Sequence, residues 1–275
     1  MTLFGTIVIG FDGTPRSDGA IGLGSTLARV TGDEVAVVLA YPVTPLSARV
    51  GGGEFRDLTR QEALRRIDAA RSRITGVRLR HLRSTPAGTP VHALHSAARQ
   101  DDAGLIVVSD SAKEQGGTPE RLLRDAPAAI AVARPWTGSH PRLARIAVAL
   151  DGSDPASAGL RVARALAGQP ESPVEDLELL SYGDGPEPAW LIDAAAASGG
   201  RAVREPGDRV EGLLRRSRSL DLLIVGSRDL GPLRRRRSSS VSVRMVRDAQ
   251  CPVLVMPRGV PSKPITIVPK SVTRP

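Results

Sequence analysis

The chain has 275 residues, of which 41% are hydrophobic and only 3% aromatic, and it carries a formal net charge of +9 at pH 7. This length has room for two ordinary domains, with cores built from aliphatic side chains. No apolar run is as long as a membrane span, no signal peptide is expected at the N-terminus, and the single cysteine, Cys251, excludes a disulfide within the chain. We therefore expect a cytoplasmic protein with no membrane partner.

Apolar runs alternate with helical patterns along the first half of the chain. We expect strands at residues 7–11, 34–41, 77–82, 105–109 and 130–133, and helices at 17–31, 56–74, 89–99 and 119–124. The second half repeats this order, with strands at 146–150, 176–181, 201–204, 221–226 and 252–256, and helices at 155–168, 188–198, 208–218 and 240–248. Such alternation predicts an α/β fold of two tandem, doubly wound, parallel five-stranded sheets.

The two halves are a duplication. Residues 7–15 (IVIGFDGTP) correspond to residues 146–153 (IAVALDGS), and residues 104–110 (GLIVVSD) correspond to 221–227 (DLLIVGS). The repeated unit has the size of a domain. We expect domains at residues 1–134 and 143–258, a linker at 135–142 and a tail at 259–275.

Both first strands end in an Asp-Gly turn. These turns comprise Asp12, Gly13 and Thr14 in the first half, and Asp151, Gly152 and Ser153 in the second. Each aspartate is interpreted either as a turn residue that caps the next helix or as a carboxylate at a ligand cleft, and both interpretations can hold together. No metal site and no catalytic residue is predicted, because the four histidines form no ligand cluster and no Ser-His-Asp order is present.

The segment after strand four of the second half, residues 226–242, is rich in Gly and Ser. Such a loop leading into a helix can present backbone N–H groups to phosphates, or it can simply be a capped, solvated loop. The run Arg234–Arg237 favours anions, but no aromatic residues interleave it, so nucleic acid is not an expected partner.

These motifs together resemble the universal stress protein family, as a tandem pair that covers essentially the whole chain. The resemblance implies the fold already predicted, known also as adenine nucleotide alpha hydrolase-like, and it implies that ATP with Mg, or no cofactor at all, is bound. ATP-binding members carry Gly-x2-Gly-x9-Gly-(Ser/Thr) after strand four. In the second half these positions are Gly226, Asp229, Ser239 and Ser240, so that two of the four match.

The resemblance therefore places any nucleotide site in the second half. Its residues would be Asp151, Gly152, Ser153, Gly226, Arg228, Gly231, Ser239 and Ser240. The first half would hold a degenerate site, with a loop too short for a triphosphate, at Asp12, Gly13, Thr14, Ser109, Gly116 and Gly117.

Three functions remain open at this point. The first is a stress-response module that senses or signals through weak ATP or adenylate binding, without catalysis. The second is a scaffold that binds no nucleotide and works through an unknown protein partner. The third is a nucleotidyl-transfer enzyme of related architecture.

The last strands of the two halves, at Ile130–Ala133 and Val253–Met256, are short and apolar. Bare apolar edges pair with other strands, and the resemblance implies antiparallel pairing of this strand. We expect the halves to pair within the chain through these strands, with Val132 facing Val255. A homodimer of the tandem chain is compatible with this arrangement.

Overall fold

The computed structural model describes most of the chain. The described residues are 2–42, 52–87, 89–110, 117–135, 142–169, 172–227 and 240–258. Most of the expected linker, the arginine run at 234–237 and the tail at 259–275 lie outside these residues. None of the described helices is both long and apolar enough to span a bilayer.

The first half alternates strands and helices as the sequence predicts. Its elements are β1 (Thr6–Gly10), α1 (Ser17–Thr31), β2 (Glu34–Pro42), α2 (Gly52–Arg71), β3 (Arg78–Ala87), α3 (Pro90–Gln100), β4 (Leu105–Ser109), α4 (Thr118–Leu122) and β5 (Ala129–Ala133). The third strand continues well beyond Leu82, where its apolar alternation ends, because it pairs with β2 as far as Ala87.

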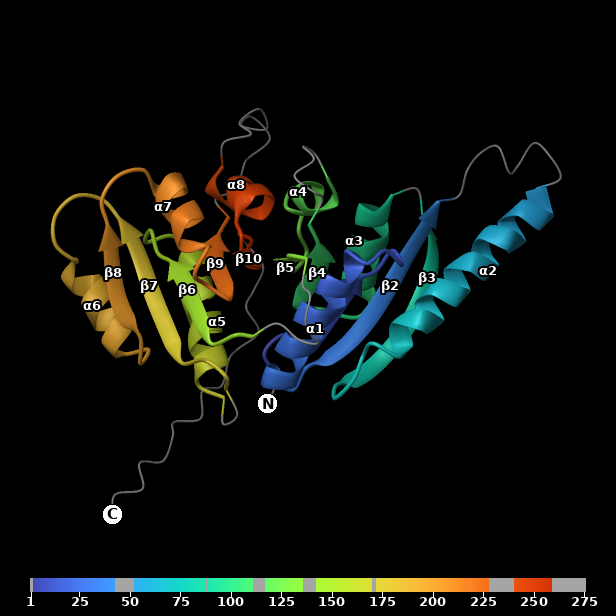
Figure 1. Cartoon of the computed structure of the whole chain (residues 1–275), viewed down its shortest axis with the longest axis horizontal. Coiled ribbons are helices and arrows are strands. Elements are labelled where there is room, and N and C mark those ends of the chain that lie inside the picture. Colours follow the sequence, from blue (N-terminus) through green and yellow to red (C-terminus); the bar gives the residue numbers. More distant parts are fainter. Residues whose placement is uncertain are drawn as a thin grey trace, which may run out of the picture.

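The second half repeats the same series. Its elements are β6 (Arg145–Ala149), α5 (Asp154–Ala167), β7 (Asp176–Tyr182), α6 (Ala189–Ala196), β8 (Arg201–Glu205), α7 (Arg209–Arg216), β9 (Leu222–Gly226), α8 (Val241–Asp248) and β10 (Val253–Met256). The predicted α/β fold with five parallel strands in each half is confirmed. The two five-stranded sheets join through β5 and β10 into one ten-stranded sheet in the order β3-β2-β1-β4-β5-β10-β9-β6-β7-β8 (Figure 1).

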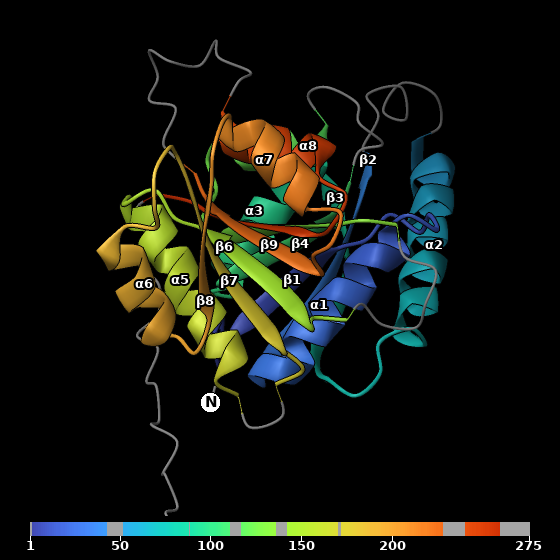
Figure 2. The ribbon, with the colours of Figure 1, turned by 60° about the vertical axis from the view of Figure 1, so that its left-hand side comes forward.

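The helices cover this sheet in two layers. Buried side chains of α1, α2, α5 and α6 pack on one face, and those of α3, α4, α7 and α8 pack on the other. Figure 2 shows α7 and α8 on one side of the strands and α1, α5 and α6 on the opposite side. Each layer contains residues of both halves, so the hydrophobic core continues through the middle of the molecule.

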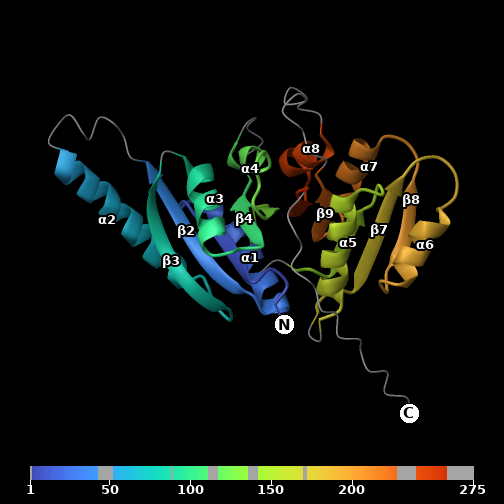
Figure 3. The same ribbon diagram turned by 180° about the vertical axis from the view of Figure 1, so that it is seen from behind.

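The halves meet where β5 runs antiparallel to β10. Val132 pairs with Val253, Ala131 with Leu254 and Ile130 with Val255, and all six residues are fully buried. The expected pairing of strand five with strand five is therefore confirmed, but the partner of Val132 is Val253 rather than Val255. In Figures 1 and 3 the halves lie side by side, and α4 and α8 face each other across this joint.

The register of the joint can be tested by crosslinking. In a Cys251→Ala background, we expect Val132→Cys with Val253→Cys to oxidise to a disulfide within one chain, because directly opposed cross-strand residues have Cα atoms within bonding range. Non-reducing electrophoresis would show a monomer of altered mobility. The offset pair Val132→Cys with Val255→Cys is the matched control, and faster closure of that pair would contradict the register.

Candidate functional site

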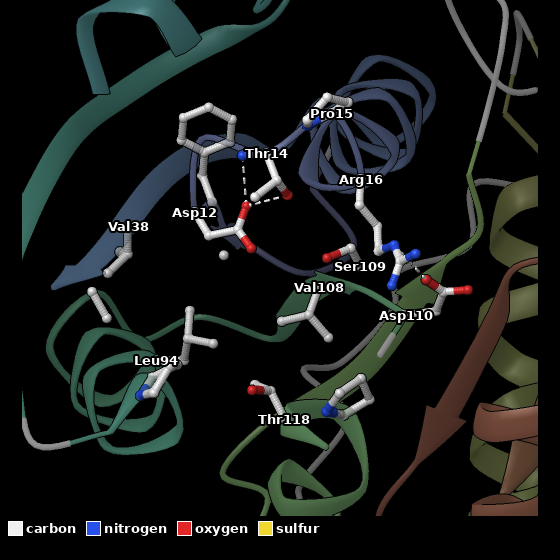
Figure 4. Close-up of a pocket in the computed structure, with 15 residues that line it drawn as sticks. Asp12, Thr14, Pro15, Arg16, Val38, Leu94, Val108, Ser109, Asp110 and Thr118 are labelled. Carbon is white, nitrogen blue, oxygen red and sulfur yellow. Dashed lines mark hydrogen bonds and ion pairs between the residues drawn. The ribbon is translucent and has the colours of Figure 1, made fainter. Parts of the chain in front are cut away.

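The first half contains a cavity of about 620 Å³ where β1 and β4 end (Figure 4). Carboxyl ends of neighbouring parallel strands are where open α/β sheets place ligands, and the volume is that of a small-molecule site. The lining residues come from the ends of β1, β2 and β4, from the turn before α1, and from the starts of α3 and α4. They are Gly10, Phe11, Asp12, Thr14, Pro15, Arg16, Val38, Ala40, Pro90, Leu94, Val108, Ser109, Asp110, Thr118 and Pro119.

Asp12 forms the predicted turn at the mouth of this cavity. Gly13 has φ +82°, a left-handed conformation that favours glycine, and it turns the chain so that Thr14 donates to Asp12 Oδ1 from both its backbone N (2.8 Å) and its hydroxyl (2.6 Å). Burial alone would raise the pKa of Asp12, but these hydrogen bonds outweigh it and hold the pKa below its usual value. The carboxylate is therefore ionised at neutral pH, and its second oxygen points into the cavity (Figure 4).

Asp110 supplies a second carboxylate to the wall, and the sequence analysis missed it. Its Oδ1 is buried and accepts no hydrogen bond from any described residue, although Arg16 Nε lies 3.7 Å away. Its Oδ2 lies 3.6 Å from Arg134 Nη1. Asp110 is the residue after Ser109, which stands in the first glycine position of the family motif, so its place after strand four could have indicated it.

The opposite wall is apolar. Val38 and Ala40 extend from β2, and Pro90 and Leu94 belong to the first turns of α3. The cavity thus combines a hydrophobic slot with two carboxylates, an arrangement suited to a flat apolar ligand that carries hydrogen-bond donors.

The corresponding place in the second half carries larger side chains among its described residues. Gly10 pairs with Val38 and Ala149 pairs with Leu180, so that Tyr182 in the second half corresponds to Ala40. The ring of Tyr182 packs where a Cβ on Gly212 would lie, at 2.3 Å. An aromatic ring therefore stands where the first half has only a methyl group.

Arg209 of α7 also lies at this place, next to the Asp-Gly turn of the second half. The helices α3 and α7 begin alike, with Thr89 accepting from His92 N and Asp208 accepting from Glu211 N, so Arg209 corresponds to Pro90. Arg209 Nη1 lies 3.3 Å from Oδ2 of Asp151, while Oδ1 of that carboxylate accepts from the backbone N and the hydroxyl of Ser153. The Asp-Gly turn is the same in both halves, but among the described residues an arginine pairs with its carboxylate in the second half and not in the first.

Other predicted residues of the second half have structural roles. A Cβ on Gly226 would lie 2.7 Å from Ala156 N, so the close approach of α5 accounts for this glycine. Ser153 caps α5 and Ser240 caps α8, each hydroxyl accepting a backbone N–H of its helix. Arg228, Gly231, Ser239 and, in the first half, Gly116 lie outside the described residues; Gly117 lies at the start of α4.

Among the described residues, no group of three or more His, Cys, Asp or Glu side chains is placed to hold a metal ion. His95 is half-buried on α3 and hydrogen-bonds to the backbone of Leu122 in α4.

Comparisons with known proteins agree with the sequence resemblance. Residues 194–257 match the model of the universal stress protein family. A universal stress protein from Archaeoglobus fulgidus matches 92% of this chain and 96% of its own, with 20% identity and a TM-score of 0.72. A putative universal stress protein from Pseudomonas aeruginosa matches 92% of this chain and 93% of its own, with 15% identity and a TM-score of 0.57. No curated protein sequence matches the chain. The two structures show that the whole chain has their fold.

One prediction concerns the floor of the cavity, where α3 meets α4. Burial lowers the pKa of His95 from 6.5, and the charge of Arg99 adds to this effect, whereas a hydrogen bond to the backbone of Leu122 opposes it. The unfolded chain then binds the proton more readily, so His95 should reduce the free energy of unfolding as the pH falls below about 6.5, by at most about 1.4 kcal/mol per pH unit.

Urea unfolding between pH 7.5 and 5 would measure this dependence. The variant His95→Gln should show a shallower loss of stability than the parent. The variant His92→Gln, which alters an exposed histidine of the same helix, should keep the slope of the parent. Equal slopes for the parent and His95→Gln would show that the buried imidazole does not control this loss.

Proposed function

We propose that this chain, which carries the universal stress protein fold twice, acts as a binding module for a small adenosine-type ligand held in the cavity of the first half, without transforming it. The observation that carries the proposal is the pair of carboxylates, Asp12 and Asp110, in a cavity whose opposite wall is apolar. A nucleoside matches this surface, since its base is flat and its hydroxyl and amino groups are hydrogen-bond donors.

The carboxylate oxygens support a nucleoside more than a polyphosphate. Asp12 is ionised with one oxygen facing the cavity, and the Asp110 side chain is 14% exposed in the cavity wall, so a ligand that donates hydrogen bonds from hydroxyl or amino groups matches both carboxylates. A triphosphate would bring negative charge toward both groups, and among the described residues that line the cavity Arg16 is the one cation. We therefore propose adenosine or its monophosphate as the ligand class, ahead of ATP with Mg.

This proposal moves the expected site from the second half to the first. The family motif after strand four favours the second half, but there Arg209 pairs with Asp151, Tyr182 stands in place of Ala40, and helix packing accounts for Gly226, which supports the first half instead.

Isothermal titration calorimetry with adenosine, AMP and ATP tests the proposal. We expect adenosine or AMP to bind with a dissociation constant on the order of micromolar, about −8 kcal/mol, and ATP to bind more weakly. The variant Asp12→Asn should weaken binding by about tenfold or more, because it removes the charge from a hydrogen bond. The variant Asp151→Asn, at the matched position of the second half, should leave the affinity unchanged.

A second variant introduces two residues of the second half at the equivalent positions of the first-half cavity. Ala40→Tyr with Ala93→Gly places the pair Tyr182 and Gly212 into the first half, because Ala93 and Gly212 are equivalent residues of α3 and α7. Binding should then be abolished, while circular dichroism stays that of the parent. Undetectable binding of all three ligands to the parent would favour the scaffold function, and binding that survives this substitution would place the site elsewhere.

A further inference from the structure

Arg134 connects the two halves at the end of the joint. It follows β5 directly, and only 11% of its side chain is exposed. Its Nη2 donates to the carbonyls of Met245 (2.9 Å) and Val246 (2.8 Å), and its Nε donates to the carbonyl of Cys251 (3.2 Å). Two of these acceptors lie in the last turns of α8, where a cation is favourable, and the Met245 carbonyl also accepts from Ala249 N (3.1 Å).

The same guanidinium faces the cavity of the first half. Arg134 Nη1 lies 3.6 Å from Oδ2 of Asp110, whose side chain is 14% exposed. Burial lowers the pKa of Arg134, and the nearby carboxylate of Asp110 opposes that effect. One buried cation is thus shared between a carboxylate of the cavity wall and the end of a helix in the other half.

This bridge has no equivalent in the second half. In the aligned segments 122–135 (LLRDAPAAIAVARP) and 245–258 (MVRDAQCPVLVMPR), the position of Arg134 is taken by Pro257. Proline has no side-chain donor, so the connection runs in one direction only, from the cavity of the first half to α8 of the second.

The helix α8 in turn packs against α7, which carries Arg209. Arg244 of α8 lies 4.0 Å from Glu211 of α7. A displacement of α8 would therefore be transmitted to α7, the helix that carries Arg209.

We propose that Arg134 is a positioning residue that couples the first-half cavity to helix α8, so that a ligand donating to Asp110 changes how firmly the end of α8 is held. The part of this inference that concerns a ligand rests on the proposed function. The bridge itself can be tested without any ligand.

The single cysteine provides the test, because Cys251 is buried and its carbonyl accepts from Arg134. Burial also raises the pKa of its thiol to about 12, so alkylation in the native state requires local opening. We would measure the rate of iodoacetamide labelling of Cys251 in the full chain under native conditions. The variants are Arg134→Gln, Asp110→Asn, the double variant, and Asp18→Asn as a control that breaks an exposed ion pair with Arg73.

We expect Arg134→Gln to label about tenfold faster or more, because hydrogen bonds from a charged donor are lost. Asp110→Asn should also label faster, although this residue belongs to the other half, and the double variant should be no faster than Arg134→Gln. Asp18→Asn should label at the parental rate. If Arg134→Gln does not fold, Arg134→Lys, which keeps the charge and loses the fork of donors, replaces it with the same expectation.

The coupling is overturned if Asp110→Asn labels at the parental rate or if the two effects simply multiply. Addition of AMP to the parent then separates the two proposals. AMP that binds by calorimetry and changes the labelling rate by about threefold or more supports the coupling to a ligand. If AMP binds without changing the labelling rate, only the coupling to a ligand is contradicted. If AMP does not bind, the proposed function is contradicted, and the labelling rates of the variants still test whether Arg134 couples Asp110 to α8.

Discussion

The antiparallel contact between β5 and β10 determines the arrangement of the whole molecule. Each half alone would be a parallel sheet with a fully apolar strand at one edge, and such an edge pairs with any strand available. Because the two copies are tethered in one chain, each edge finds its partner at a high effective concentration. The six residues of this ladder are fully buried, and both helical layers continue across it. Both clefts are therefore held on a single sheet.

Duplication on this sheet has allowed the two clefts to diverge while the fold is kept. The Asp-Gly turn, the capped starts of α3 and α7 and the strand order are the same in both halves. Two differences distinguish the cavity of the first half from the equivalent place in the second: Tyr182 replaces Ala40, and Arg209 replaces Pro90. The second half keeps its Asp-Gly turn because the turn has a structural role. Each aspartate fixes its turn through the following hydroxyl residue, whether or not a ligand is present.

Much of the fold could be predicted from the sequence, because strands buried on both faces are continuous apolar runs. The predicted strand boundaries were wrong where burial ends. The C-terminal part of β3, beyond Leu82, is partly exposed and polar, and its strand conformation is defined by pairing with β2. The site was harder to predict. The sequence offers a glycine motif in the second half, but a glycine required for close helix packing looks the same as one that approaches a phosphate, so the motif alone does not distinguish the two roles. The informative difference between Ala40 and Tyr182 is present in the sequence, yet it becomes readable only once the registers of β1 with β2 and of β6 with β7 are known.

Arg134 was missed for a related reason, since its role depends on contacts with residues more than a hundred positions away in the sequence. The contribution of a buried ion pair to the free energy of unfolding gives little reason for the contact between Arg134 and Asp110. Replacing a buried ion pair by well-packed apolar groups is often neutral or stabilising, and the joint already has an apolar ladder that holds it together. A buried arginine with three carbonyl acceptors and one carboxylate instead fixes where the end of α8 lies relative to the cavity. The apolar strands thus account for the attachment of the two halves, and the arginine accounts for their alignment.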